Sequence, residues 1–343
     1  MIHQPLLTIC IPTFNRCVSL SLLLLTLREE LQGLQNQVEV LVSDNASTDE
    51  TASTLDSLIA DWSDLRIRRN QKNLGPESNF LACLEEVHTR YCWFIADDDL
   101  PKLGVIRRIL KLLNEMQPAL VYMQSEWVAP LTHHAQGKHF DAIRAEAMDS
   151  LGFVQRVHAW LTFISGIVFD RSALKTALRG EAIDRFNGTS LVQLGWVLPL
   201  LRLESRCFVF IPETCILATK GNSGGYPLLT VFGQNLTHIA QLVFGPDTPL
   251  SRALIRGNVM YNLPLLIWSA RTSSFGSFEK ENPWPVLQQA MRGHSLYWLL
   301  LMPLGRFPFW AANFLFQLWR VFSRLGRESL RWRIRPLQIA FYF

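Results

Sequence analysis

The stretch from Tyr91 to Pro101 constrains the fold of this chain more than any other. Tyr91 to Ile95 is an aromatic and aliphatic run with the length and residue types of a buried central strand. Three consecutive aspartates follow it: Asp97, Asp98 and Asp99. Strand ends in open α/β sheets form ligand crevices, and two carboxylates two residues apart can converge on one hard divalent ion. The triplet alone therefore fits either a metal site or a solvated acidic turn that caps the next helix.

The residues before this stretch alternate between strand-like and helix-like segments. Short apolar runs predict further strands at 6–11, 38–43 and 65–69. Longer segments of helical character predict helices at 18–32, 49–61 and 78–89. Four strands that alternate with helices over about a hundred residues indicate βαβ units and a largely parallel sheet. The sequence has neither G-x-G-x-x-G nor G-x-x-x-x-G-K-S/T, which argues against a dinucleotide fingerprint and a P-loop.

The charge of the chain is concentrated at one end. Eight arginines and one acidic residue, Glu328, follow position 290, so this end carries +7 and the rest of the chain −3. A near-neutral body argues against a nucleic-acid-binding protein. The six cysteines form no C-x-x-C pair, and the first residues lack the basic and apolar regions of a signal peptide. We therefore expect a cytoplasmic chain in a reducing compartment.

Four motifs at the predicted strand ends resemble those of family 2 glycosyltransferases. They correspond to the first strand and loop, the nucleotide-binding turn, the N-x-G element and the D-x-D motif of that family, and lie at Thr8–Arg16, Val42–Thr51, Asn73–Gly75 and Ala96–Asp99. The match covers residues 6–125, with the four motifs in the same order and at similar spacing. Within the family, the run from Asn73 to Asp99 is most similar to abequosyltransferase-like enzymes of O-antigen assembly.

The resemblance implies a GT-A fold, in which a mostly parallel α/β sheet is flanked by helices. We expect the GT-A domain at 1–230, with a nucleotide-sugar half at 1–125 and an acceptor half at 126–230. Residues 231–343 are expected to form a helical extension that ends in a membrane-associating segment at 295–343.

By similarity, residues at the motif positions bind the nucleotide-sugar. They are Pro12, Thr13, Asn15, Asp44, Asn45, Arg69, Asn73, Gly75, Asp97 and Asp98. Asp97 and Asp99 are expected to hold a divalent metal ion, Mg²⁺ or Mn²⁺, that stabilises the leaving nucleoside diphosphate. Two alternatives stay open. Asp44 either contacts the base or forms a turn with its own backbone, and Arg69 or Lys72 either neutralises the diphosphate or is a solvated loop charge.

The general base is less well defined. Inverting members of the family deprotonate the acceptor hydroxyl with an acidic residue. The corresponding stretch here, 188–196, contains no carboxylate. Asp184, just upstream, is the candidate base, and Glu126, near the end of a predicted strand at 119–127, is the alternative. If neither reaches the acceptor, metal and positioning alone would support catalysis, or the stereochemical outcome would differ from that of the family.

We make predictions for three other segments of the acceptor half. Residues 163–171 resemble the small-residue strand that lines the acceptor side of this fold. The glycine-rich run 220–226 is either a loop that closes over the donor or a plain connector. Three histidines without regular metal spacing, His133, His134 and His139, are interpreted as part of a loop.

The C-terminal segment predicts an amphipathic helix beyond Phe309. A polar, basic face recurs at three- and four-residue steps: Asn313, Gln317, Arg320, Arg324, Arg327 and Arg331. The other side is apolar and aromatic: Phe314, Leu318, Val321, Phe322, Leu325 and Trp332. Such a helix fits the interface of an anionic leaflet, and its alternative is packing on the body or on a partner.

Taken together, the residues and the resemblance predict a glycosyltransferase peripheral to the cytoplasmic face of the inner membrane. It would move a sugar from a nucleoside diphosphate-sugar to a hydroxyl of a glycan, an oligosaccharide linked to a polyprenyl diphosphate. Two alternatives remain. A sugar nucleotidyltransferase would need a Gly-rich phosphate loop after the first strand, which 12–16 does not supply. A catalytically degenerate, membrane-associated partner in polysaccharide assembly would fit the absent base.

Overall fold

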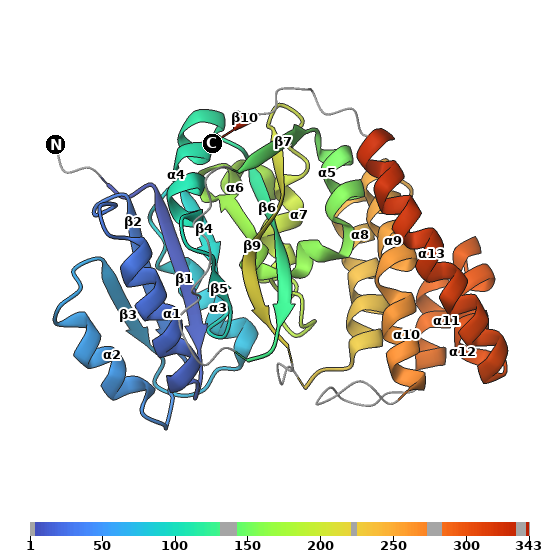
Figure 1. Ribbon diagram of the computed structural model, residues 1–343, viewed down its shortest axis with the longest axis horizontal. Coiled ribbons are helices and arrows are strands. Elements are labelled where there is room, and N and C mark those ends of the chain that lie inside the picture. The colour runs from blue at the N-terminus through green and yellow to red at the C-terminus, as the bar shows by residue number, and fades with distance from the viewer. Residues whose placement is uncertain (1–3, 131–142, 221–224, 273–282, 334–340, 343) are drawn as a thin grey trace.

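The computed structural model describes residues 4–130, 143–220, 225–272, 283–333 and 341–342. Figure 1 shows a twisted sheet flanked by helices, with a layer of helices from the C-terminal part of the chain packed against one side. Within the described ranges the strands form one sheet in the order β10-β7-β9-β6-β8-β4-β1-β2-β3, and β5 pairs with β9 outside this path.

The N-terminal part of the sheet is parallel. Its strands are β1 (Leu7–Thr13), β2 (Val38–Asp44), β3 (Leu65–Arg69) and β4 (Tyr91–Phe94). β1 lies between β2 and β4, with Leu7 opposite Val38 on one side and Tyr91 on the other. All four predicted strands are therefore confirmed, and their carboxyl ends meet at one edge of the sheet, as parallel pairing requires.

The other part of the sheet is mixed. Its strands are β5 (Leu100–Pro101), β6 (Leu120–Val128), β7 (Arg144–Met148), β8 (Ile167–Asp170), β9 (Phe208–Thr219) and β10 (Phe341–Tyr342). β8 runs antiparallel to both β4 and β6, and β6 is parallel to β9. The predicted strand at 163–171 is correct only from Ile167 onward, because 164–166 is a short 3-10 turn. The carbonyl of Ser165 there accepts a hydrogen bond from the Trp93 indole instead of joining the ladder.

Alternate strand residues face two hydrophobic cores, one on each side of the sheet. Ile9, Val40 and Trp93 pack with the helices α1 (Cys17–Glu30), α2 (Thr51–Ile59) and α4 (Val105–Met116). Cys10 and Phe94 point the other way. The helices on that side are α3 (Pro76–Glu85), α5 (Ser150–Val157), α6 (Arg171–Leu178) and α7 (Leu194–Leu200). The period of two along each strand therefore divides the side chains between the two layers of helices.

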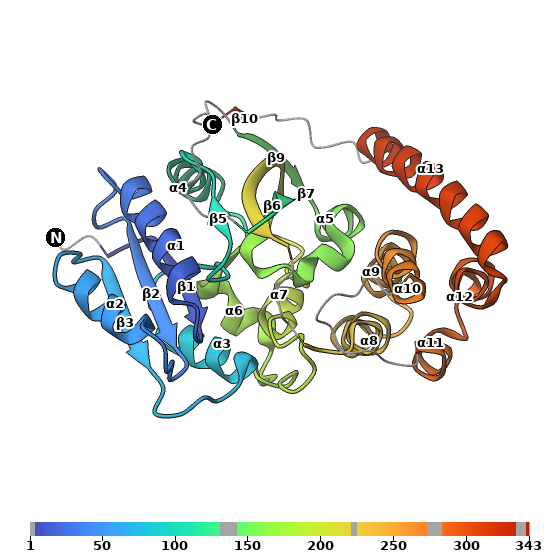
Figure 2. The same ribbon diagram turned by 60° about the horizontal axis from the view of Figure 1, so that its bottom comes forward.

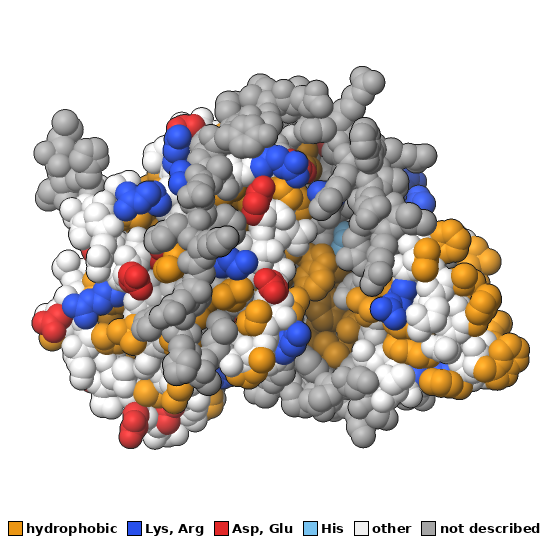
Figure 3. All heavy atoms as spheres, in the orientation of Figure 1, with side chains coloured by type: hydrophobic (Ala, Val, Ile, Leu, Met, Phe, Trp, Pro, Cys, Tyr) orange, Lys and Arg blue, Asp and Glu red, His pale blue; other side chains and the backbone are white. Residues whose placement is uncertain are grey.

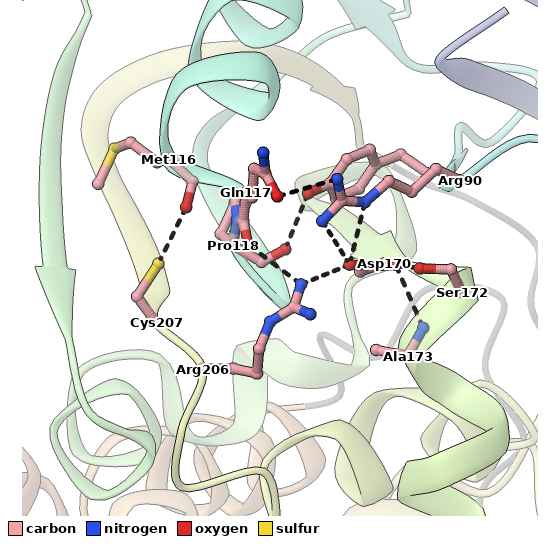
Figure 4. A network of polar contacts seen from close by, with 10 residues as sticks. Arg90, Met116, Gln117, Pro118, Asp170, Ser172, Ala173, Arg206 and Cys207 are labelled. Carbon is pink, nitrogen blue, oxygen red and sulfur yellow. Dashed lines mark hydrogen bonds and ion pairs between the residues drawn. The ribbon is translucent and has the colours of Figure 1, made fainter.

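A charged network fixes the sheet at the end opposite the strand ends described above. Asp170, the last residue of β8, is fully buried and accepts hydrogen bonds from Arg206 and Ser172 (Figure 4). The Arg90 guanidinium lies 3.3 Å from the same carboxylate and donates to Gln117. Three residues of this network each lie within three residues of the start of a strand: Arg90 before β4, Gln117 before β6 and Arg206 before β9. The network therefore joins the starts of three strands to the end of a fourth.

The C-terminal part of the chain is helical, as expected. It contains η3 (Thr230–Asn235), α8 (Leu236–Phe244), α9 (Pro249–Tyr261), α10 (Leu263–Arg271), α11 (Pro283–Met291), η4 (Tyr297–Leu301), α12 (Met302–Arg306) and α13 (Phe309–Arg333). The break between α9 and α10 falls just before Pro264, which lies in the first turn of α10. In the part of the chain that the structure describes, no helix is both long and apolar enough to cross a lipid bilayer.

The helix α13 forms the outer edge of the molecule (Figure 2). Phe316 stacks on Trp268 with ring centroids 4.5 Å apart, and the Trp319 indole donates to the Met260 carbonyl at 2.7 Å. These side chains form a buried face that the sequence interpretation did not separate from the exposed apolar one. The apolar residues that it did assign are exposed in the described part of the helix: Phe314, Leu318, Val321 and Phe322.

Candidate active site

A cavity of about 520 Å³ opens where β1, β2 and β4 end. Five of the predicted nucleotide-sugar residues line it: Pro12, Thr13, Asn45, Asn73 and Asp97. The segments 162–164 and 190–193 form part of its wall, together with Tyr226. The cavity therefore joins the strand ends of the parallel half to segments that lie 65 or more residues further along the chain.

The three aspartates after β4 have three different surroundings. Asp97 lines the cavity and accepts a hydrogen bond from the Thr13 hydroxyl at 2.7 Å. Asp98 forms an ion pair with Arg16, also at 2.7 Å. Asp99 is buried and accepts from the Ser165 hydroxyl at 2.6 Å and from the Thr219 backbone N–H at 3.0 Å. Asp97 is thus the member of the triplet whose side chain borders the cavity.

Burial also changes the acidity of two of these groups. Desolvation raises the pKa of Asp97 to about 6, although the Thr13 hydrogen bond and the Arg16 charge oppose the shift. Desolvation raises the pKa of Asp99 to about 7 against hydrogen bonds from Ser165 and Thr219. A buried carboxylate with a raised pKa favours either a proton or a nearby cation.

Amide side chains hold the turn beside the cavity. Asn45 is buried and donates through Nδ2 to Asn73 Oδ1 at 2.8 Å and to the Gly75 carbonyl at 3.2 Å. Its Oδ1 accepts from Asn70 and from the Leu74 backbone N–H. The N-x-G element is thereby fixed against the end of β2. Gly75 has a φ of +81°, a conformation that glycine adopts readily.

Two predicted residues shape loops at this edge without bordering the cavity. Asp44 is buried, and its Oδ1 accepts the Ser47 backbone N–H at 3.0 Å. The contact is the turn-forming role that the sequence left open for this residue. Asn15 accepts the Thr48 backbone N–H at 2.7 Å, so it joins the loop after β1 to the loop after β2. Base contacts by Asp44 and Asn15 remain predictions.

The arginine at the cavity differs from the one that the sequence singled out. Arg69 points toward α2, where it forms an ion pair with Asp56 at 2.7 Å. Arg16 lines the cavity, and its ion pair with Asp98 places a guanidinium next to the triplet. Arg16 directly follows the predicted binding residues Pro12, Thr13 and Asn15, and this position in the sequence could have identified it as a cavity residue. A diphosphate role for Arg69 or Lys72 remains a prediction.

Neither predicted base borders the cavity in the described part of the chain. Asp184 is exposed, and Glu126 forms a partly exposed ion pair with Lys102 at 3.7 Å. Glu77, which directly follows the N-L-G-P run, does line it. Its carboxylate accepts the backbone N–H groups of Gly188 at 2.8 Å and Val192 at 3.2 Å. A carboxylate is therefore present beside the very segment that lacks one of its own.

Two predictions fall on residues that the structure does not describe. The three histidines, His133, His134 and His139, lie outside the described residues, as do 221–224 of the glycine-rich run. No cluster of three His, Cys, Asp or Glu side chains suited to a metal occurs among the residues that are described.

Residues 8–162 match the family model "Glycosyl transferase family 2". Two curated relatives are similar over part of the chain. Abequosyltransferase RfbV of Salmonella typhimurium is 38% identical over 95 residues, which are 27% of this chain and 28% of the relative. A Campylobacter jejuni GalNAc(5)-diNAcBac-PP-undecaprenol beta-1,3-glucosyltransferase is 30% identical over 117 residues, 33% of this chain and 36% of the relative. The similarity thus spans about a third of the relatives' length.

Solved structures are similar over nearly the whole chain. S. aureus TarS 1-349, crystallised in complex with UDP-GlcNAc, has a TM-score of 0.55 at 17% identity and covers 98% of both chains. The mannosyltransferase PcManGT from Pyrobaculum calidifontis, in complex with GDP-Man and Mn²⁺, has a TM-score of 0.51 at 14% identity, over 94% of this chain and 87% of that one. These likenesses confirm the predicted fold, a GT-A-type α/β sheet followed by a helical part.

Proposed function

We propose that this chain, whose residues 8–162 match the model of family 2 glycosyltransferases, transfers a sugar from a nucleoside diphosphate-sugar to a hydroxyl of a glycan. One observation carries the proposal. The cavity at the strand ends brings Thr13, Asn45, Asn73 and Asp97 of four separate motifs together, which the spacing in the sequence does not require. Ligands of open α/β sheets bind in this position.

A divalent cation, Mg²⁺ or Mn²⁺, is part of the proposal. Asp97 fits such an ion because its carboxylate borders the cavity, is mostly buried and has a raised pKa. Mg²⁺ is commonly held by one or two carboxylates together with substrate phosphates, so Asp97 and a diphosphate would complete the ligand set. The ion would stabilise charge on the departing diphosphate. Asp99 stays a predicted second ligand, and both of its oxygens accept protein hydrogen bonds here.

The chain's own residues have further roles in this reaction. The Thr13 hydroxyl orients Asp97, and Arg16 holds Asp98. The amides of Asn45 and Asn73 lock the turn that borders the base and ribose side of the cavity. Glu77 holds the segment 188–192 through two backbone N–H groups, and in this proposal the acceptor hydroxyl enters the cavity on the side of that segment.

The acceptor that we propose is a lipid-linked oligosaccharide of bacterial surface polysaccharide synthesis. The names of both curated relatives support this class, because one is an abequosyltransferase and the other acts on a glycan whose name includes PP-undecaprenol. The α13 helix supports it too, since an exposed apolar stripe on it would bring the enzyme to the surface where such an acceptor is anchored. The proposed location is accordingly the cytoplasmic face of the inner membrane.

The experiment that tests the activity is a nucleotide-release assay. The protein is incubated with UDP-, GDP-, CDP- and TDP-sugars, with Mg²⁺ or Mn²⁺ and with bacterial lipid-linked oligosaccharide. We expect acceptor-dependent release of one nucleoside diphosphate, abolished by EDTA. A second incubation contains a sugar phosphate and a nucleoside triphosphate instead. Release of pyrophosphate there would identify a nucleotidyltransferase. Nucleotide binding without any turnover would favour the degenerate partner.

A further inference from the structure

Three aromatic side chains gather outside the lining of the cavity, and one of them, Phe163, also packs against a hydrophobic core. They are Trp127 near the end of β6, Trp160 in the 3-10 turn η1 (His158–Thr162), and Phe163, which follows it. The Trp127 ring centroid lies 6.4 Å from that of Trp160 and 5.7 Å from that of Phe163. Trp127 is 42% exposed and Trp160 37% exposed. We call these three residues the aromatic platform.

The exposure of the aromatic platform is unusual for its position. The first four residues of β6, Leu120 to Met123, are buried in the two cores, and the strand then runs past them. Large aromatic groups that cluster together and remain partly exposed can mark a binding site rather than a packing site.

Two connections fix the aromatic platform relative to the aspartate triplet. The first is the segment 162–165. Thr162 and Ile164 line the cavity, Phe163 between them contacts Trp127, and Ser165 donates to Asp99. This segment therefore separates the cavity from the platform, with side chains directed to both.

The second connection runs through β9. Trp127 is opposite Ala218 in the parallel pair of β6 and β9. The next residue, Thr219, donates its backbone N–H to Asp99 at 3.0 Å and its hydroxyl to the Asp98 carbonyl. The platform and the triplet thus belong to one rigid hydrogen-bonded frame, so a molecule bound on the platform would be held at a fixed place relative to the cavity.

We propose that the aromatic platform binds a pyranose ring of the acceptor glycan, one or more residues away from the hydroxyl that reacts. This inference rests on the proposed function. Flat rings with one face exposed match the apolar C–H face of a sugar. A polar group for its hydroxyls lies on the same strand face, in Ser125, two residues before Trp127.

The position of the platform distinguishes this occupant from two others. The donor nucleotide would lie in the cavity, on the other side of 162–164. The exposed apolar stripe of α13 offers a lipid surface a larger contact, at the outer edge of the molecule (Figure 2). A glycan extended from the cavity is the ligand that reaches the platform while its end remains at Asp97.

The test uses the full chain and the variants Trp127→Ala, Trp160→Ala and Trp127→Phe. Binding of three soluble probes, maltotriose, chitotriose and mannotriose, is measured by saturation-transfer NMR with UDP, GDP, CDP or TDP and Mn²⁺ present. Trp310→Ala removes a tryptophan of α13 that is 76% exposed and serves as the control. Melting temperatures confirm that each variant is folded.

We expect at least one trisaccharide to bind the wild type, with affinity reduced about tenfold in each alanine variant and largely kept in Trp127→Phe and Trp310→Ala. Nucleotide-induced stabilisation should be unchanged in all variants. Equal trisaccharide binding by the wild type and both alanine variants, or no trisaccharide binding by a wild type that does bind nucleotide, would overturn the platform alone. If the wild type binds none of the four nucleotides, the proposed function is overturned, and the proposal for the platform with it.

Discussion

Asp97 and Asp99 are two residues apart in the chain and have opposite relations to the cavity. Asp97 borders it, whereas both oxygens of Asp99 accept hydrogen bonds from Ser165 and Thr219. A D-x-D pattern identifies the carboxylates that can meet an ion. It does not specify which of them later segments of the chain engage, because those donors lie 66 and 120 residues away.

Arg16 and Arg69 illustrate the same limit. Both follow or end a strand at the correct edge of the sheet, so both were within reach of the cavity by sequence. Arg69 lies on the edge strand β3, whose neighbour α2 supplies Asp56 as a partner. The direction of a long side chain depends on which partner is nearer, and a single sequence does not give that information.

Glu77 lines the cavity, whereas the two bases predicted from sequence, Asp184 and Glu126, do not, and this difference gives the first prediction. We expect Glu77→Gln to lower kcat by roughly 10²-fold or more, the usual range for loss of a general base or its positioning. Asp184→Asn and Glu126→Gln should keep most of the activity, because both side chains lie outside the described cavity lining. Steady-state kinetics on the three variants decides the matter, and a large loss only in Asp184→Asn would restore the assignment made from sequence.

At the scale of elements, the N-x-G turn depends on one amide. Asn45 donates to Asn73 and to the Gly75 carbonyl, and an aspartate cannot donate to either. We expect Asn45→Asp to lower the free energy of unfolding by about 2 kcal/mol or more, because acceptors would then face a buried carboxylate. Urea denaturation measures the loss. The exposed Asn187→Asp serves as control, and equal stability of the two variants would contradict this role.

The Asp170 network gives a prediction for stability and its pH dependence. Burial raises the pKa of Asp170, but hydrogen bonds from Ser172 and Arg206 and the charges of Arg90 and Arg206 outweigh it, so the pKa is lowered. A carboxyl with a lowered folded-state pKa stabilises the fold above its unfolded pKa, and this contribution is lost as the pH falls through the folded value.

We therefore expect Asp170→Asn to cost roughly 3–5 kcal/mol at pH 7 and the difference from wild type to shrink in acid. Chemical denaturation across pH 3 to 8 measures both effects. The difference in unfolding free energy should begin to shrink as the pH falls towards the unfolded pKa of an aspartate, about 3.9. Asp56→Asn, which breaks the surface pair with Arg69, should change stability by about 1 kcal/mol at most. A cost for Asp170→Asn that stays constant down to pH 3 would contradict the account.

The elements themselves were largely predictable in the first half of the chain. β1 to β4 and the helices between them have the local patterns of βαβ units, and the boundaries differ by a few residues. Residues 163–166 were not predictable from their strand-like composition, because Ser165 accepts hydrogen bonds from distant residues. Its carbonyl accepts from the Trp93 indole and its hydroxyl from the Ala96 backbone N–H. α13 was correct as a helix, but its second, buried apolar face comes from packing on Trp268 and Met260.

At the scale of the whole molecule, the stripe of exposed apolar residues on α13 predicts membrane binding. Figure 3 shows hydrophobic side chains gathered on the flank over α12 and α13. The chain's charge of +7 beyond residue 290 adds attraction to anionic lipid. We expect Phe314→Ser, Val321→Ser and Phe322→Ser together to lower binding to phosphatidylglycerol vesicles about a hundredfold, because each side chain buries apolar area there.

Vesicle sedimentation measures this binding. The matched control replaces three exposed apolar residues of the N-terminal body with serine: Leu25, Ile59 and Leu74. The wild type should bind neutral phosphatidylcholine vesicles much more weakly than anionic ones. Sedimentation of the α13 triple variant at the wild-type level would show that the stripe serves another contact.

The central claim is that the cavity beside Asp97 binds a nucleoside diphosphate together with a divalent ion. The most direct measurement is a thermal-shift titration with UDP, GDP, CDP and TDP, with and without Mn²⁺, on the wild type, Asp97→Asn and Asp99→Asn. We expect one nucleotide to stabilise the wild type only with Mn²⁺, by about 2.7 kcal/mol at a hundredfold excess over Kd. Asp97→Asn should remove this shift, and Asp99→Asn should in addition lower the melting temperature of the unliganded protein. A wild type that responds to none of the four nucleotides, or an Asp97→Asn variant with an unchanged Mn²⁺-dependent shift, would contradict the account.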